Sequence, residues 1–254
     1  MSAHDEFYVG YQPNAPEGLG RFLRMLTASL LVVGVLVALA AVGFQQPFGA
    51  ARFEFGETRT FEGTLLSLPQ PMLIVARPGE IQGEASSISS YYLVNPGKIG
   101  AGDAIADLSG QHVTLEGTLI YRDNQTMIEI LPDTVAAADG TPLQPSRIVD
   151  LGEHTFVGEI VDSKCFLGVM VPGNLKPHRA CATRCISGGI PPILLVRRED
   201  GTARHLLLVG PSGEAINHQI LDLIAEPVEI TGKLERHLDR LVLKADPTRF
   251  QRLN

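Results

Sequence analysis

The sequence has little of what several protein classes require. It holds only three cysteines in 254 residues, too few for a disulfide-based miniprotein, and the odd number leaves at least one thiol free, metal-bound or paired with another chain. Basic residues are outnumbered, 21 Lys plus Arg against 28 Asp plus Glu, and a formal charge of -7 argues against a nucleic-acid partner. P-loop, dinucleotide-binding and Ser-His-Asp motifs are also missing. What remains, 44% hydrophobic and 19% charged residues, is the balance of a folded globular chain.

One long apolar segment lies near the N-terminus. Residues 25–44 carry no charged side chain, and at ~1.5 Å per residue a helix of this length crosses the ~30 Å hydrocarbon core of a membrane. Arg21 and Arg24 directly precede this segment, whereas the next basic residue is Arg52. The positive-inside rule therefore places residues 1–24 in the cytoplasm and the C-terminal part outside, which in a bacterium is the periplasmic side of the inner membrane.

A cleaved signal peptide is the alternative to a membrane anchor. Ala38, Leu39 and Ala40 have the small-x-small form of a cleavage site. However, the preceding leader contains three acidic residues, and the apolar run exceeds the usual ~7 to 15 residues of a signal peptide. Both features favour a retained anchor.

The chain after the anchor contains an internal repeat. Leu93 lies 24 residues before Gly117, and Leu208 lies 24 residues before Gly232, so the two copies align here without a gap. The matching segments are 61–63 with 156–158, 71–75 with 192–196, and 93–119 with 208–234. An ungapped block of this length indicates duplication.

Each copy has the pattern of five short strands with a short helix between the third and the fourth. In the first copy the strand segments are 58–67, 72–76, 90–94, 113–121 and 126–131, and the helical spacing is at 99–108. This order is that of the OB-fold, a five-stranded Greek-key barrel; another small five-stranded barrel or sandwich is the alternative.

The predicted fold is therefore mainly β, with one N-terminal transmembrane helix followed by two tandem OB-like barrels. The predicted segments are a cytoplasmic stretch at 1–24, the helix at 25–44, the barrels at 53–135 and 150–254, and a linker at 136–149 that contains Asp139-Gly140, Pro142 and Pro145.

The second copy contains an insert that the first lacks. From Gly63 to Pro71 is 8 residues, but from Gly158 to the matching Pro192 is 34, so the second copy has gained 26 residues between its first two strands. All three cysteines lie in this insert, at 163–189. A long loop that only one copy carries is where we expect function.

The insert is predicted to place three metal-binding side chains on one helix face. Pro177 is a favourable first helical residue and Gly188-Gly189 a favourable end, which predicts a helix over 178–186. At ~100° per residue, His178, Cys181 and Cys185 then point within about 60° of one another.

Cys165, upstream on another element, can fold over this face as a fourth ligand. Three thiolates and one neutral imidazole predict a site for copper, zinc or iron, with Met170 as an extra soft ligand if the ion is copper.

The same cysteines fit two other interpretations. Because cysteines oxidise outside the cytoplasm, a disulfide from Cys165 to Cys181 or Cys185 would staple the loop. A redox-active thiol is the third interpretation, although the insert has no CxxC motif. Its spacing also matches neither CxxC zinc knuckles nor CxxCH haem attachment.

Four basic residues and no acidic one lie between Ser163 and Cys185. They are Lys164, Lys176, Arg179 and Arg184. On a chain of net negative charge this is a candidate patch for an anion or an acidic partner surface, and a solvated face is the alternative.

The segments DSKC (162–165), HRxCAxxC (178–185) and GGIPP (188–192) resemble an uncharacterised family of bacterial exported or membrane-anchored proteins. The resemblance implies a bacterial source and a role for the insert, and it brings no activity with it. The sequence thus predicts a periplasmic accessory or assembly subunit whose insert holds a metal or redox centre. Its expected partners are the membrane and other membrane or periplasmic subunits, and enzymatic turnover is not required. A non-catalytic interaction module with a structural disulfide, or a thiol-disulfide redox protein, is the alternative.

Overall fold

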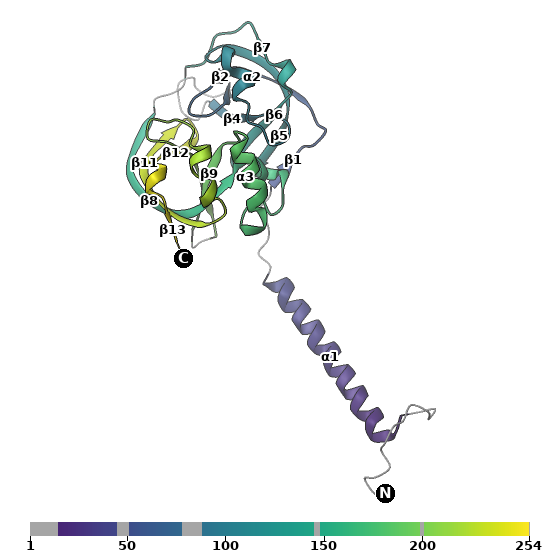
Figure 1. The fold of residues 1–254 in the computed structure, drawn as a ribbon. Coiled ribbons are helices and arrows are strands. Elements are labelled where there is room, and N and C mark those ends of the chain that lie inside the picture. Colours follow the sequence, from purple (N-terminus) through teal and green to yellow (C-terminus); the bar gives the residue numbers. More distant parts are fainter. Residues whose placement is uncertain (1–14, 45–50, 78–87, 145–147, 199–200, 254) are drawn as a thin grey trace. The chain divides into compact units, whose positions relative to one another are not determined.

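The computed structural model describes residues 15–44, 51–77, 88–144, 148–198 and 201–253. It divides the chain into two units, Met1–Pro47 and Phe48–Asn254 (Figure 1). The first unit contains a single described helix, α1 (Glu17–Gly43), in which no side chain is buried. Its 27 residues are long and apolar enough to cross a membrane, as the sequence predicts.

The second unit begins with a closed five-stranded barrel. Its strands are β2 (Arg59–Leu66), β3 (Met72–Ala76), β4 (Ile88–Val94), β5 (His112–Arg122) and β6 (Gln125–Ile130). They pair in the order β2-β3-β4-β6-β5 and back to β2, and only β4 and β6 run parallel. The helix α2 (Gly102–Ile105) and a 3-10 turn (Ala106–Leu108) stand between β4 and β5, so the predicted OB-like order is confirmed.

Two short strands extend this barrel. The strands β1 (Ala51–Phe53) and β7 (Ala136–Ala137) both pair antiparallel with β5. The start of the segment predicted as a linker is therefore part of the first sheet.

The second barrel repeats the same strand order. Its strands are β8 (Val149–Asp162), β9 (Pro192–Arg197), β10 (Ala203–Val209), β11 (Pro227–His237) and β12 (Arg240–Lys244), and β13 (Gln251–Arg252) pairs with β11. Neighbours run β8-β9-β10-β12-β11 and back to β8, again with one parallel pair, β10 with β12. In place of the predicted short helix there are two 3-10 turns, Asn217–Gln219 and Leu221–Leu223. Asn217 is buried in the first turn, and its amide donates to the carbonyl oxygens of Ile186 and Ile190 in the chain that leads to β9.

The insert lies between β8 and β9. It consists of a π-helical turn (Cys165–Val169), a 3-10 turn (Lys176–His178) and the helix α3 (Arg179–Ser187). The predicted helix over 178–186 is therefore confirmed, shifted by one residue.

The two barrels meet through corresponding parts of the repeat. One apolar cluster contains three aligned pairs, Tyr92 with Leu207, Val94 with Val209, and Met127 with Val242. Gln125 and Arg240, the first residues of β6 and β12, bond directly through Oε1 and Nη1. Equivalent positions of the two copies therefore contribute to one shared core. The duplication thus built a pair of barrels with a common core, and the insert of the second reaches the first.

Candidate metal centre

The three cysteine sulfurs converge at the end of β8. Cys165 begins the π-helical turn that follows this strand, whereas Cys181 and Cys185 lie one turn apart on α3. The Sγ atom of Cys165 is 3.9 Å from the Sγ of Cys181 and 3.9 Å from the Sγ of Cys185. All three are free thiols, so the structure does not contain the disulfide that the alternative interpretation requires.

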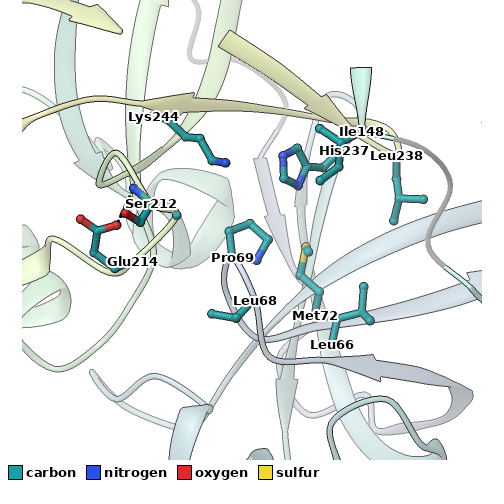
Figure 2. A pocket seen from close by; sticks show the side chains of 11 residues that line it. Leu66, Leu68, Pro69, Met72, Ile148, Ser212, Glu214, His237, Leu238 and Lys244 are labelled. Carbon is teal, nitrogen blue, oxygen red and sulfur yellow. Dashed lines mark hydrogen bonds between the residues drawn. The ribbon is translucent and has the colours of Figure 1, made fainter. Parts of the chain in front are cut away.

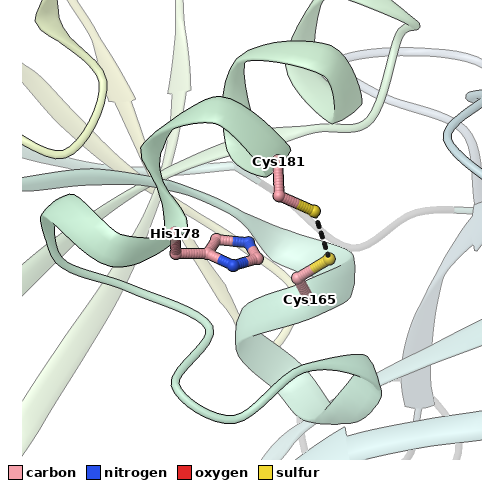
Figure 3. A group of neighbouring side chains, drawn as sticks. All are labelled: Cys165, His178 and Cys181. Atoms are coloured by element: carbon pink, nitrogen blue, oxygen red, sulfur yellow. Dashed lines mark hydrogen bonds between the residues drawn. The ribbon is translucent and has the colours of Figure 1, made fainter.

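His178 points into the same cluster. Figure 3 shows its ring directed toward the sulfurs of Cys165 and Cys181, and one donor atom of each of these three residues lies within 4.8 Å of the others. The structure therefore places the donor atoms of Cys165, His178 and Cys181 in one group, and Cys185 joins it through its 3.9 Å contact with Cys165. His178 and Cys165 are 3% and 4% exposed, Cys185 is 1% exposed, and Cys181 is partly exposed.

A fifth residue, Asp162, supports the cluster and was not among the predicted ligands. Its side chain is fully buried. One carboxylate oxygen bonds Nε2 of His178 at 2.9 Å, and the other accepts the backbone amide of Cys165 at 2.8 Å. Asp162, Cys165 and Cys185 also form a second group of donor atoms within 4.8 Å of one another. An Asp three residues before the Cys is the spacing of a side chain that caps the next turn, which is the sequence pattern that indicates this contact.

The second unpredicted residue, Lys98, comes from the first barrel. Its Nζ lies 2.7 Å from Sγ of Cys181 and 3.7 Å from Sγ of Cys185. The amide of Gly100 donates to the carbonyl oxygen of Gly188 at 2.9 Å, which holds the loop of Lys98 against the end of α3. No spacing in the sequence connects Lys98 with the insert, because the contact exists only once the barrels pack together.

The thiols differ in acidity because they share one hydrogen bond. The bond to Cys185, followed by burial, raises the pKa of Cys165, whereas the same bond lowers the pKa of Cys185 despite its burial. Its hydrogen bond to Cys181 raises the pKa of Lys98. The Cys185 thiol is therefore more acidic than the Cys165 thiol.

The predicted basic patch is not one uncompensated surface. The side chain of Lys164 is 3% exposed, pairs with Glu129, and donates to the carbonyl oxygens of Asn95 (2.8 Å) and Gly97 (2.7 Å) of the first barrel. Its charge holds the barrels together and is not available to a ligand.

Two of the other three basic residues also have a carboxylate partner. Glu226 lies 3.4 Å from Nζ of Lys176 and 2.6 Å from Nη1 of Arg179. Arg184 is exposed and has no ion pair within the described ranges. These pairings were not predictable from the insert, because Glu129 and Glu226 are far from it in sequence.

Met170, predicted as an extra ligand, follows the π-helical turn. Its side chain is 44% exposed, and its amide donates to the carbonyl oxygen of Cys165 at 3.2 Å. This contact holds the backbone of Met170 beside Cys165.

Comparison with protein-family models, with curated proteins and with solved structures finds no significant match.

Proposed function

We propose that this chain is a membrane-anchored accessory or assembly subunit whose barrel unit binds one metal ion through Cys165, His178, Cys181 and Cys185. Zn²⁺ is the ion that the donor set fits best, and copper and iron are the alternatives. The observation that carries the proposal is the spacing of the sulfur atoms.

A tetrahedral ion with metal–sulfur bonds of ~2.3 Å holds its sulfur ligands about 3.8 Å apart. The two separations from Cys165 are both 3.9 Å. A disulfide would require ~2.05 Å. Cys181 and Cys185 are thus each spaced from Cys165 as two sulfur ligands of one ion are.

The imidazole is oriented for the same role. With Nε2–H donating to Asp162, the lone pair of His178 lies on Nδ1, the remaining ring nitrogen. A carboxylate behind a ligating histidine fixes the ring and raises its basicity, which is a common arrangement around bound zinc. Full burial of Asp162 makes this orientation rigid.

The donor count favours a structural over a catalytic ion. Three sulfurs and one nitrogen fill a tetrahedron, whereas catalytic zinc keeps one position for water or substrate. Burial of Cys165, Cys185 and His178 to 4% exposure or less also leaves little access. The ion would clamp the insert to the end of β8, and Lys98 would balance the excess negative charge of three thiolates.

The anchor and the clamp together support the accessory role. The apolar helix α1 is long enough to hold the chain at a membrane, and Arg21 and Arg24 at its N-terminal end favour retention of that end in the cytoplasm. We therefore place the barrels on the outer, periplasmic face, where they would contact other subunits of a membrane complex.

A thiol–disulfide redox protein is the second candidate. The observation in its favour is that Cys165 lies equally close to Cys181 and Cys185, 3.9 Å from each. In this case the purified protein would lose two free thiols on mild oxidation and would bind no ion.

The test uses the full-length chain purified in detergent under reducing conditions, with metal content and free thiols measured on the same sample. We expect one Zn²⁺ per chain, lost in Cys185→Ser and in His178→Ala. Met170→Leu is the matched control in the same segment and should keep its ion. Wild-type protein that binds neither zinc, copper nor iron, or a Cys185→Ser variant with unchanged metal content, would overturn the proposal.

A further inference from the structure

The contact between Lys98 and Cys181 is unusually close for a hydrogen bond. Nζ and Sγ are 2.7 Å apart. This is the lower end of the ~2.7 to 3.2 Å range for N–H···O bonds, and N–H···S bonds are longer because sulfur is the larger atom. If one light atom were bonded to both the nitrogen and the sulfur, two single bonds of about 1.5 Å would place N and S about 2.5 Å apart. Because a bond to sulfur is longer, the separation would be slightly larger, and the observed 2.7 Å matches this value.

Both residues are held in place by the backbone around them. The carbonyl oxygens of Asn95 and Gly97, just before Lys98, accept hydrogen bonds from buried Lys164. On the other side, the amide of Gly100 is bonded to Gly188 at the end of α3. The packing of the two barrels therefore holds the backbone of Lys98 beside the end of α3.

Accessibility separates Cys181 from the other thiols. Lys98 is exposed and Cys181 partly exposed, whereas Cys165 and Cys185 are 4% and 1% exposed. Small oxidants reach an exposed thiol before a buried one, and such thiols are the ones that oxidise selectively. Cys185 is also farther from the amine, at 3.7 Å.

We propose that Lys98 and Cys181 form a covalent N–O–S bridge when the metal-free protein meets dioxygen. The bridge would be a reversible modification site that links the first barrel to the insert of the second.

The reaction balances with dioxygen as the oxidant. The S–H bond of Cys181 and one N–H bond of the Lys98 amine break, and one S–O and one O–N bond form. The second oxygen atom leaves as water with the two hydrogens. Sulfur and nitrogen each lose two electrons, and dioxygen accepts all four. Two molecules of an added dithiol, each oxidised to its disulfide, supply four electrons and four hydrogens and return the amine, the thiol and a second molecule of water.

The bridge also regulates the metal centre, and this consequence rests on the proposed function. A bridged Cys181 no longer has a thiolate to offer, so only Cys165, Cys185 and His178 remain as ligands. Conversely, a bound Zn²⁺ occupies the Cys181 sulfur and protects it. Metal loading and bridge formation should therefore exclude each other.

The experiment compares metal-free full-length protein, kept anaerobic with reductant, with the same protein in air-saturated buffer. Mass spectrometry of the aerated chain should show the gain of one oxygen and the loss of two hydrogens. Peptide mapping should show the peptides of Lys98 and Cys181 joined, and dithiothreitol should separate them. Protein loaded with Zn²⁺ before aeration should stay unmodified.

Two variants serve as controls. Lys98→Arg keeps the positive charge on an exposed site but has no amine to bridge, so it should form no joined peptide. Cys185→Ser should still form it. A disulfide between Cys165 and Cys181, a Cys181 sulfenic acid without a joined peptide, or no change in mass would each overturn the bridge.

Zinc binding to the reduced wild-type protein is measured separately. A reduced protein that binds Zn²⁺ but forms no bridge refutes this inference alone. A bridge in a protein that binds no metal refutes the proposed function alone.

Discussion

Replacing Asp162 by Asn should remove His178 from the metal centre while leaving all four ligands in the chain. Asp162 accepts two hydrogen bonds, from the amide of Cys165 at 2.8 Å and from Nε2 of His178 at 2.9 Å. An Asn side chain has only one oxygen. If that oxygen keeps the backbone bond, its NH₂ group faces Nε2, and the ring can avoid two opposed donors only by moving its proton to Nδ1. The nitrogen proposed to bind the ion is then blocked.

The size of the effect follows from the complete burial of this pair, where no water can replace the lost acceptor. Removing the carboxylate behind a ligating histidine costs about 10- to 100-fold in metal affinity, or roughly 1.4 to 2.7 kcal/mol. We expect Asp162→Asn in the upper part of this range. The assay is a competition titration of Zn²⁺ between full-length protein in detergent and a chromophoric chelator.

Asp107→Asn is the matched control, because it makes the same chemical change at an exposed position outside the site. Its zinc affinity should equal that of the wild type. An Asp162→Asn variant that folds and binds Zn²⁺ as tightly as the wild type would refute the proposed orientation of His178.

Four further predictions concern the barrels and the anchor. Arg240→Met should lower the free energy of unfolding by about 3 kcal/mol, measured by thermal unfolding, because buried partners in the first barrel lose their donor; unchanged stability would contradict the shared core. Gly188→Ala should separate the barrels and weaken zinc binding, since a Cβ there would overlap the carbonyl oxygen of Lys98; an unchanged melting temperature would be the opposing result. Burial lowers the pKa of His205, so the folded protein resists protonation of this side chain. The contribution of His205 to stability is therefore fully present above ~6.5, the pKa of histidine in the unfolded chain, and is lost as the pH falls below that value. His205→Phe should therefore lose less stability than the wild type between about pH 7 and pH 5, and parallel curves would contradict this. A reporter fused after Asn254 should be active only outside the cytoplasm, and cytoplasmic activity would refute the topology.

Much of the fold could be predicted because it is encoded in short-range patterns. An uncharged 20-residue run defines α1, and alternation within each copy defines the strands. Because the repeat aligns without a gap, it predicts the same strand order for both copies. The segment before β11 was harder, because the side chain of Asn217 bonds to backbone next to the insert, a contact that has no local signature.

The residues of the candidate site also differ in whether a local sequence pattern predicts them. His178, Cys181 and Cys185 were predictable because helix geometry alone aligns them, and Cys165 followed as the remaining soft ligand. Asp162 had a local indication in its position three residues before Cys165. Lys98 and the burial of Lys164 had none, since both depend on how the first barrel packs against the insert. Long-range charge pairing, rather than local sequence, decided which basic residues were free.

X-ray absorption at the zinc edge of the full-length, reduced protein tests the central claim most directly. The account predicts three sulfur atoms at ~2.3 Å and one nitrogen at ~2.0 Å, with the nitrogen contribution lost in His178→Ala. Two results would contradict the account: zinc ligands that are only oxygen and nitrogen, or a number of bound sulfur atoms that stays the same in Cys185→Ser.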